Sequence, residues 1–354
     1  MENAPIPLVK KHLSSWGTGR VQPLGPQDDE GVLTVVLEDA RHLDALLASD
    51  LVGDRTLVFS PGGSTGPVVG YEGSLAEPGG DLSINDAFFL QTQDYGSAGY
   101  MSVIGATLVR IVEQADFEAY LDDADRARAE GTFQSFVISP AVQLADIAAL
   151  GGSSPADGPR TRLYAHADGS LSVSPWGARL GTLGDGLARL DAEWHRLGRD
   201  GAHPCALALG RAVPETLGAA AAAERPWLGR YLAAVDALRE LQARGIAEAR
   251  VSGFGGRLAP ALDGMGDADA HDAVGTDVPL LLWTQDEAYV HIVDGKRTFK
   301  VDHTAGAVIE ALLVCGSVEA ADAYADRAAL LRVERFFRHT GVALGGDALV
   351  GAGR

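Results

Sequence analysis

Cysteine is nearly absent from this sequence. The 354 residues include two, Cys205 and Cys315, which lie far apart along the chain. Two distant cysteines build neither a disulfide framework nor a structural zinc site. No apolar run reaches the roughly 20 residues that a membrane-spanning helix needs, and residues 1–17 lack the basic-then-apolar pattern of a secretory signal. We therefore expect a cytoplasmic protein that holds no metal.

Basic residues are also scarce. Lys and Arg number 29 against 48 Asp and Glu, which gives a formal net charge of −19 and a pI of about 4.8. Proteins that bind nucleic acid or anionic lipid need clustered Lys and Arg at the phosphates. The balance argues against nucleic acid and membranes as partners. A hydrophobic fraction of 46% is typical of globular proteins, and the length predicts two or three domains.

Residues 1–150 are expected to form a mixed α/β N-terminal domain. Short runs of β-branched residues predict strands at Leu33–Asp39 and Thr56–Ser60, with a helix between them, which suggests a βαβ unit. The later pattern predicts one or two strands within Tyr100–Glu113, a helix over 115–131, a strand at Phe133–Ser139 and a short helix over 142–150.

An α/β middle domain is expected at residues 160–260. Its residues alternate on both sides of Asp168-Gly169, a dipeptide that favours a two-residue hairpin turn. Helical spacing follows at Gly184–Gly198 and Pro226–Gly245. The Gly- and Asp-rich residues 261–277 show no periodicity, so they are predicted to be a linker.

Residues 278–344 predict three short strands followed by three helices. The strands are VPLLLWT, AYVHIVD and KRTFKVD, and the turn pair Asp294-Gly295 separates the last two. Helical patterns follow at His303–Gly316, after Ser317, and at Arg327–Gly341. This βββααα order is that of a small winged-helix module. The expected fold class is therefore α+β and multidomain, with a mixed α/β N-terminal region followed by this C-terminal module.

The C-terminal module resembles the PqqD-like RiPP recognition element, which binds leader peptides in the biosynthesis of ribosomally made, modified peptides. The resemblance lies in the segments DGKRTFKVD, HTAGAVIEALLVCG and RAALLRVERFFRHTGVAL. The layout of the whole chain looks like the recognition proteins of daptide-type clusters. The resemblance implies a precursor peptide as ligand, and modifying enzymes of the dehydrogenase, aminotransferase or methyltransferase type as partners.

In that family the peptide adds to the third strand and rests against the third helix. A three-stranded sheet has an edge whose backbone groups can pair with an extended chain, which supports the same expectation. Phe336 and Phe337 diverge by about 100° on a helix, so one should lie in the core and the other should line the peptide groove. The expected peptide-binding residues are Lys296, Arg297, Thr298, Phe299, Lys300, Val301, Arg327, Leu331, Arg332, Arg335, Phe336 and Arg338.

Two alternatives stay open. One is a RiPP-modifying enzyme with its site in residues 1–260 and a fused recognition module, and the other is a winged-helix DNA-binding regulator. No local catalytic or cofactor signature supports the enzyme: Ser60–Pro67 lacks the lysine of a phosphate loop, Asp267–Asp277 lacks the EF-hand Gly and Glu, and the nine His show no ligand spacing. We therefore expect a non-enzymatic recognition protein without a cofactor.

Overall fold

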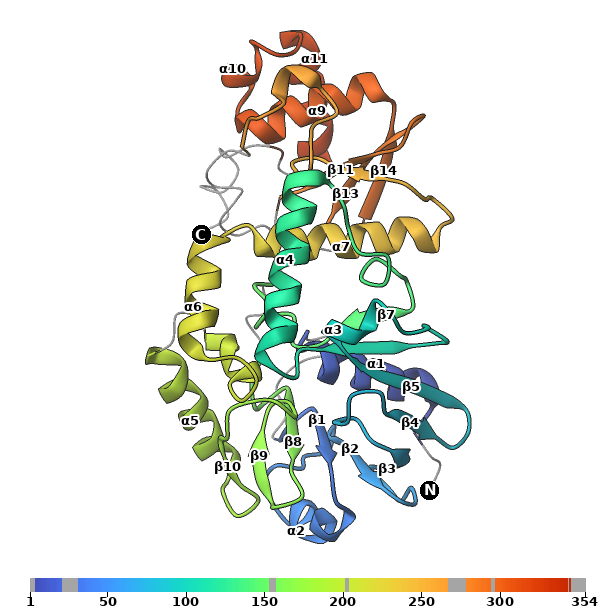
Figure 1. The fold of residues 1–354 in the computed structure, drawn as a ribbon, viewed down its shortest axis with the longest axis vertical. Helices are drawn as coiled ribbons and strands as arrows, with labels where there is room; N and C mark the ends of the chain where they lie inside the picture. Colours follow the sequence, from blue (N-terminus) through green and yellow to red (C-terminus); the bar gives the residue numbers. More distant parts are fainter. Residues whose placement is uncertain are drawn as a thin grey trace. The chain divides into compact units, whose positions relative to one another are not determined.

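A computed structural model of the chain describes residues 4–20, 31–152, 157–200, 204–266, 278–293, 297–342 and 344. The chain divides into two compact units. Unit 1 comprises Met1–Leu121 and Ala141–Glu224, and unit 2 comprises Asp122–Pro140 and Arg225–Arg354. Each unit contains one sheet (Figure 1). The protein is mixed α/β.

Unit 1 is built on a ten-stranded mixed sheet in the order β10-β9-β8-β1-β2-β3-β4-β5-β6-β7. Its strands are β1 (Thr34–Leu37), β2 (Leu57–Pro61), β3 (Val68–Gly73), β4 (Asp81–Ile84), β5 (Phe88–Asp94), β6 (Thr107–Arg110), β7 (Val142–Leu144), β8 (Arg162–Ala165), β9 (Ser170–Ser172) and β10 (Gly181–Thr182). The pairs β8-β1, β1-β2, β2-β3, β5-β6 and β6-β7 are parallel. The remaining pairs are antiparallel.

Helix α1 (Ile6–Thr18) packs inside the curve of this sheet. It contacts both β1 and β7, which stand six strands apart in the sheet order. Six spacings of about 4.8 Å would separate these strands by roughly 29 Å in a flat sheet, much more than the width of one helix. The sheet must therefore curve around α1. Val9, Leu13 and Trp16 of the helix are buried in the resulting core.

Shorter elements complete unit 1. They are η1 (Ala40–His42), α2 (Leu43–Leu47), α3 (Tyr95–Ala98), α5 (Leu187–Asp200), η2 (Pro204–Leu209) and α6 (Glu215–Glu224). Helix α5 buries Leu190 and Trp194 in a second core on β1 and β8. Helix α4 (Gln114–Glu130) begins in unit 1 and continues into unit 2, where it ends at Gly131 with φ +73°.

Unit 2 has a four-stranded antiparallel sheet in the order β11-β12-β13-β14. Its elements are α7 (Leu228–Ala243), β11 (Arg250–Val251), η3 (Pro260–Leu262), β12 (Leu280–Trp283), β13 (Ala288–Ile292), β14 (Arg297–Val301), α9 (His303–Cys315), α10 (Val318–Ala321) and α11 (Arg327–His339). Helix α9 packs on β12 and β13, and α11 packs on α9 (Figure 1). Leu281 and Val290 face these helices in the main core of the unit. The neighbouring residue His291 faces Glu240 of α7 instead, so helices cover both faces of the sheet.

Many predicted elements are confirmed. The strand–helix–strand unit forms with β1 and β2 parallel, and the Asp168-Gly169 hairpin joins β8 to β9. The long helices α4, α5 and α7 form, and the C-terminal strands and helices appear in the order βββααα. The residues expected to form a middle domain, 160–260, are divided between the two units.

Two predicted elements are wrong. Residues 133–139 form turns rather than a strand, and the Phe133 ring stacks on Tyr231 of α7 at 5.8 Å instead of joining a sheet. Residues 142–150 begin with strand β7, because Val142 and Leu144 are buried while Gln143 between them is exposed, which is the period of a strand. Within 100–113, where one or two strands are expected, one strand forms, at Thr107–Arg110.

The C-terminal sheet also differs from expectation. It has a fourth strand, β11, which pairs with β12 at Arg250↔Trp283 and Val251↔Leu282. Leu262, inside the predicted linker, is fully buried in the core of unit 2. The turn Asp294-Gly295 and the run Asp267–Asp277 lie outside the described residues. None of the described helices is both long and apolar enough to cross a bilayer.

Candidate functional site

Strand β14 is the last strand of the unit 2 sheet. It pairs with β13 on one side, and within the described ranges no strand pairs with its other side. An unpaired strand edge presents backbone donors and acceptors to solvent. Which residues of β14 present them depends on the hydrogen-bonding pattern of the sheet.

Two backbone hydrogen bonds define that pattern. The Thr284 amide donates to the Glu287 carbonyl (2.8 Å), and the Ser252 amide donates to the Leu281 carbonyl (2.9 Å). Hydrogen-bonded and non-hydrogen-bonded pairs alternate along an antiparallel ladder. Through the strand register, each bond makes Leu281 and Val290 a non-hydrogen-bonded pair of β12 and β13. Val290 therefore directs its backbone N–H and C=O groups toward β14.

The alternation extends to β14. Phe299 lies opposite Val290 and turns its amide and carbonyl into the sheet. Thr298 and Lys300, on either side of Phe299, turn theirs away from β13. Each therefore offers one donor and one acceptor at the edge, with the spacing that an added strand requires.

The side chains of β14 point to two different faces. Phe299 and Val301 pack against the core on the α9–α11 side. Thr298 points the other way, where its hydroxyl donates to Glu240 Oε1 of α7 (3.0 Å) and lies 3.1 Å from His291 Nδ1. The Thr298 side chain is therefore held by α7, and only its backbone is available at the edge.

Helix α11 has one buried and one exposed face. The Asp326 carboxylate accepts a hydrogen bond from the Ala329 amide (2.8 Å) and caps its N-terminus. Leu330 and Phe337 are buried, whereas Leu331 is 41% and Phe336 54% exposed. This confirms that Phe336 and Phe337 point in different directions.

Phe336 lies beside the edge strand. Its ring centroid is 6.4 Å from that of Phe299 on β14 and 5.3 Å from that of Phe337, both edge-on. Phe299 and Phe337 are 5.6 Å apart. The three rings form one cluster, in which Phe337 belongs to the core and Phe336 carries the exposed apolar surface.

Two cations predicted near the edge are already engaged. Lys300 Nζ lies 2.5 Å from Glu287 Oε1, and Arg297 donates to the Thr340 carbonyl (3.2 Å). The Lys300 ammonium, followed by the Tyr289 hydroxyl, lowers the pKa of the Glu287 carboxylate. The same hydroxyl–carboxylate bond raises the pKa of Tyr289 to about 12.

Two of the four arginines of α11 form ion pairs with described residues and two do not. Arg327 pairs with Asp322 of the preceding turn (3.4 Å), and Arg338 pairs with Glu334 (2.7 Å). Arg332 and Arg335 are exposed, and their side chains have no ion pair or hydrogen bond with another described residue. Lys296 lies outside the described residues. The candidate site is therefore the outer edge of Thr298 and Lys300 together with Arg332, Arg335 and Phe336 of α11. Leu331, which was also expected there, points about 140° around the helix from Phe336.

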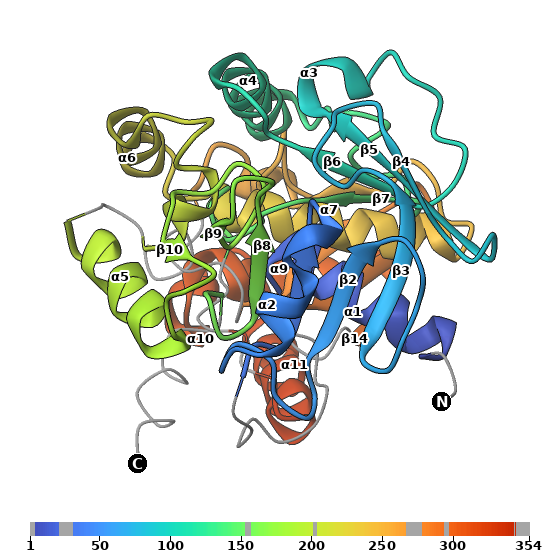
Figure 2. The same cartoon turned by 90° about the horizontal axis from the view of Figure 1, so that it is seen from below.

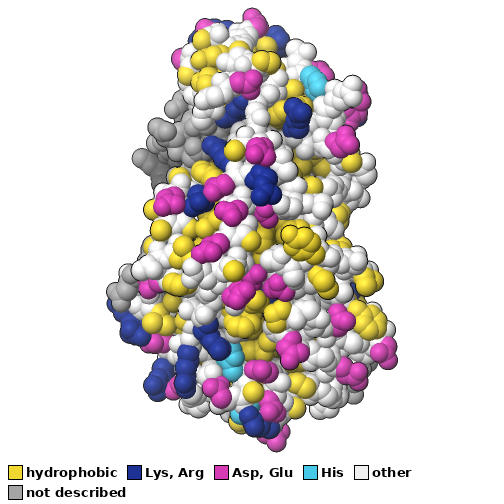
Figure 3. Space-filling model, in the orientation of Figure 1, with side chains coloured by type: hydrophobic (Ala, Val, Ile, Leu, Met, Phe, Trp, Pro, Cys, Tyr) yellow, Lys and Arg dark blue, Asp and Glu magenta, His cyan; other side chains and the backbone are white. Residues whose placement is uncertain are grey.

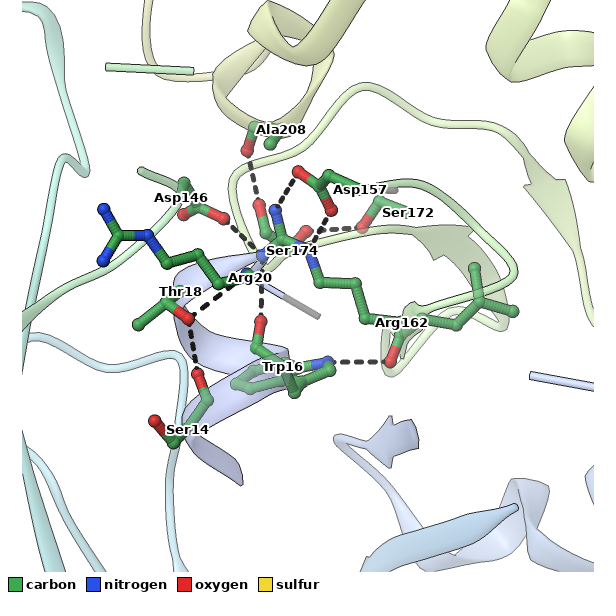
Figure 4. Close-up of polar contacts among 11 residues, drawn as sticks. Ser14, Trp16, Thr18, Arg20, Asp146, Asp157, Arg162, Ser172, Ser174 and Ala208 are labelled. Atoms are coloured by element: carbon green, nitrogen blue, oxygen red, sulfur yellow. Dashed lines mark hydrogen bonds and ion pairs between the residues drawn. The ribbon is translucent and has the colours of Figure 1, made fainter. Parts of the chain in front are cut away.

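Unit 1 contains a buried ionic cluster that no sequence pattern indicated. Arg162 donates through Nη1 to Asp146 Oδ1 (2.6 Å) and to the Trp16 carbonyl (2.9 Å). Its Nε and Nη2 atoms donate to the two oxygens of Asp157 at 2.7 and 2.8 Å (Figure 4). Arg162 is 1% exposed, and its partners come from distant parts of the sequence.

Arg110 lies next to this cluster. Its guanidinium carbon is 5.1 Å from the centre of the Trp16 ring, and its Nε and Nη2 atoms are buried with no hydrogen-bond partner among the described residues. Burial lowers the pKa of Arg110 to about 10, and the Asp146 carboxylate opposes that effect. Two arginines and two carboxylates balance in charge, and they hold the C-terminal end of α1 against β8. We assign the cluster to the fold rather than to ligand binding.

A serine–histidine–carboxylate arrangement at the end of β8 is not set up for nucleophilic attack. His166 Nε2 lies 2.8 Å from Ser172 Oγ, and Nδ1 lies 3.9 Å from Glu38 Oε2. The Ser172 hydroxyl donates to the Ser174 carbonyl (2.6 Å) (Figure 4), so His166 Nε2–H must be the donor to Ser172. A general base would need to accept that proton instead, and Ser172 is fully buried.

Groups of three or more potential metal ligands do not converge anywhere in the described ranges. Comparisons of the chain with protein-family models, with curated proteins and with solved structures found no match. Its function therefore has to be argued from the edge of β14 and the exposed face of α11.

Proposed function

We propose that this protein recognises a precursor peptide of a ribosomally synthesised, modified peptide and presents it to separate modifying enzymes. The peptide binds as an added strand along β14 and rests on α11, as in the PqqD-like recognition elements that residues 278–344 resemble. The observation that carries the proposal is the outward direction of the Thr298 and Lys300 backbone groups, derived from the sheet register.

The surface beside the edge supports a peptide with apolar and acidic residues. An added strand lies about 4.8 Å from β14, and every second side chain points to the α11 side. There Phe336 offers apolar area, and Arg332 and Arg335, on the exposed side of α11 next to it, offer charge not used within the described protein. On a chain of net charge −19 these two cations would draw an acidic peptide to this place.

A pair of substitutions at one position tests strand addition. Thr298→Pro removes the outward N–H, which a strand at a sheet edge tolerates, whereas Thr298→Val keeps that N–H and removes only the hydroxyl. The probe is a display library of random 20-residue peptides selected on the wild-type full chain, from which the most enriched peptide is synthesised. We expect Thr298→Pro to weaken its binding by about tenfold, because one backbone hydrogen bond is worth about 0.5–1.5 kcal/mol.

Thr298→Val is the matched control. Its side chain loses the bond to Glu240, so it reports any effect that comes through α7 rather than through the backbone. We expect it to bind the peptide within about twofold of the wild type. Equal affinities for Thr298→Pro and the wild type would contradict strand addition, and failure to select any peptide would contradict peptide recognition itself.

A further inference from the structure

The peptide site has a fixed polarity, because α11 runs in the opposite direction to β14. Arg297, the first residue of β14, donates to the carbonyl of Thr340, which follows the last residue of α11 (3.2 Å). Two residues further along β14, the Phe299 ring lies 6.4 Å from that of Phe336, a full turn before Thr340. Forward steps on the strand therefore correspond to backward steps on the helix, and Figure 2 labels the two elements next to each other.

Arg332 continues this correspondence. Four residues along a helix cover about 6 Å, and two residues along a strand cover about 6.7 Å. The step from Phe299 to Val301 on β14 is one such step. The matching step on α11 leads back from Phe336 to Arg332. In agreement, Val301 and Val333, the neighbour of Arg332, both pack against the core of the unit. Arg332 therefore lies level with the end of β14.

An added peptide presents alternate residues to α11. The strand pairs of the unit 2 sheet are antiparallel, and antiparallel pairing is the more stable per residue. We therefore expect the peptide to run opposite to β14. We call the peptide residue opposite Phe299 residue p. Directly opposite residues point to the same face of a sheet, so p points to the α11 side as Phe299 does. The next peptide side chain on that side, toward Val301, belongs to the residue two positions before p.

We propose that the peptide carries Asp or Glu two positions before an aromatic or large aliphatic residue, which is residue p. The acidic side chain pairs with Arg332, and the apolar one packs on Phe336. Phe299 turns its backbone into the sheet, so it forms a non-hydrogen-bonded pair with p, the kind of pair in which side chains lie closer together. Residue p thus meets the rings of both Phe299 and Phe336. This order and spacing rest on the proposed function, because they apply only to a peptide that adds to β14.

Local charge favours an acidic residue at this position. Figure 3 shows Lys and Arg side chains interspersed with Asp and Glu over the part of unit 2 where Figure 1 places α9 and α11, so the nearest cation without a described partner decides where an acid binds. Arg332 lies about 40° around the helix from Phe336, whereas Arg335 lies about 100° from it. Asp302, the residue after β14, accepts from the Ala305 amide (2.7 Å). Its charge is offset there by the N-terminus of α9.

Charge reversal on both partners tests the proposal, with the selected peptide as the probe. Residue p is identified first, as the apolar residue whose replacement by alanine weakens binding to the wild type but not to Phe336→Ala. Replacing the acid two positions before p by Lys should then weaken binding to the wild type about fivefold, the upper range for one exposed ion pair. Arg332→Glu should bind this Lys peptide within about twofold of the original pair. That recovery also shows that the variant is folded.

Arg250→Glu is the control. It makes the same change of charge in unit 2, but on β11, at the opposite end of the sheet from β14. It should keep the preference of the wild type for the acidic peptide.

A selected peptide without an acid two positions before p would overturn the proposal. So would an Arg332→Glu variant that still prefers the acidic peptide, or an Arg250→Glu control that accepts the Lys peptide equally well. Coupling of Arg332 to the residue two positions after p would mean that the peptide runs parallel to β14, and would overturn it too. In contrast, an empty selection, or Thr298→Pro binding as the wild type does, would overturn the proposed function itself, and this spacing with it.

Discussion

Phe336 and Phe337 are adjacent in sequence, but we expect their replacement by alanine to have opposite consequences. Phe337 is 2% exposed and packs against Phe299 in the core. Removing a buried phenylalanine costs about 3–5 kcal/mol, because transfer energy is lost and a cavity remains. Phe336 is 54% exposed, so its loss should cost only about 1 kcal/mol of folding free energy.

The two variants are compared by thermal unfolding and by peptide binding. At about 2–4 °C per kcal/mol, Phe337→Ala should lower the melting temperature by about 10 °C and Phe336→Ala by about 3 °C. For peptide binding the order reverses. Phe336→Ala should lower the affinity for the selected peptide by about tenfold, as expected for an aromatic anchor. Equal losses of stability would refute the orientation of α11, and unchanged affinity in Phe336→Ala would refute its place in the peptide site.

Two further predictions concern unit 1. Arg162→Met leaves Asp146 and Asp157 buried without their partner. In denaturant titrations it should destabilise unit 1 by about 3–5 kcal/mol, with peptide binding in unit 2 unchanged. A loss of less than about 1 kcal/mol would contradict the role of the cluster. Burial lowers the pKa of His12 from 6.5 to about 4. The unfolded chain therefore binds this proton first, and stability falls by about 3 kcal/mol as pH drops from about 6.5 to 4. His12→Asn should remove that part of the pH dependence, and a variant whose stability follows pH as the wild type does would exclude His12 as its cause.

Sequence patterns predicted the C-terminal elements well because each carries its own local signals. KRTFKV alternates apolar and polar residues, and α11 has Asp326 as its N-cap and Gly341 with φ +75° after its last turn. The different orientations of Phe336 and Phe337 follow from helix geometry alone. These features depend on neighbours within a few residues, so the sequence contains them explicitly.

The errors arose where distant contacts decide the structure. Residues 133–139 have strand-like composition, but Phe133 packs on Tyr231 and Phe254, and no local pattern reveals that choice. Ion pairing at the candidate site was equally hidden. The sequence shows that Lys300 and Arg332 are both basic, but only the fold places Glu287 next to one and leaves the other free of described partners.

Amide hydrogen exchange along β14 tests the central claim most directly. In the free protein we expect the Phe299 amide to be protected, because it bonds into the sheet, and the Thr298 and Lys300 amides to exchange quickly. Saturation with the selected peptide should slow exchange at residues 298 and 300 and leave residue 299 nearly unchanged. Peptide binding that leaves both outward amides exchanging as before would contradict the account.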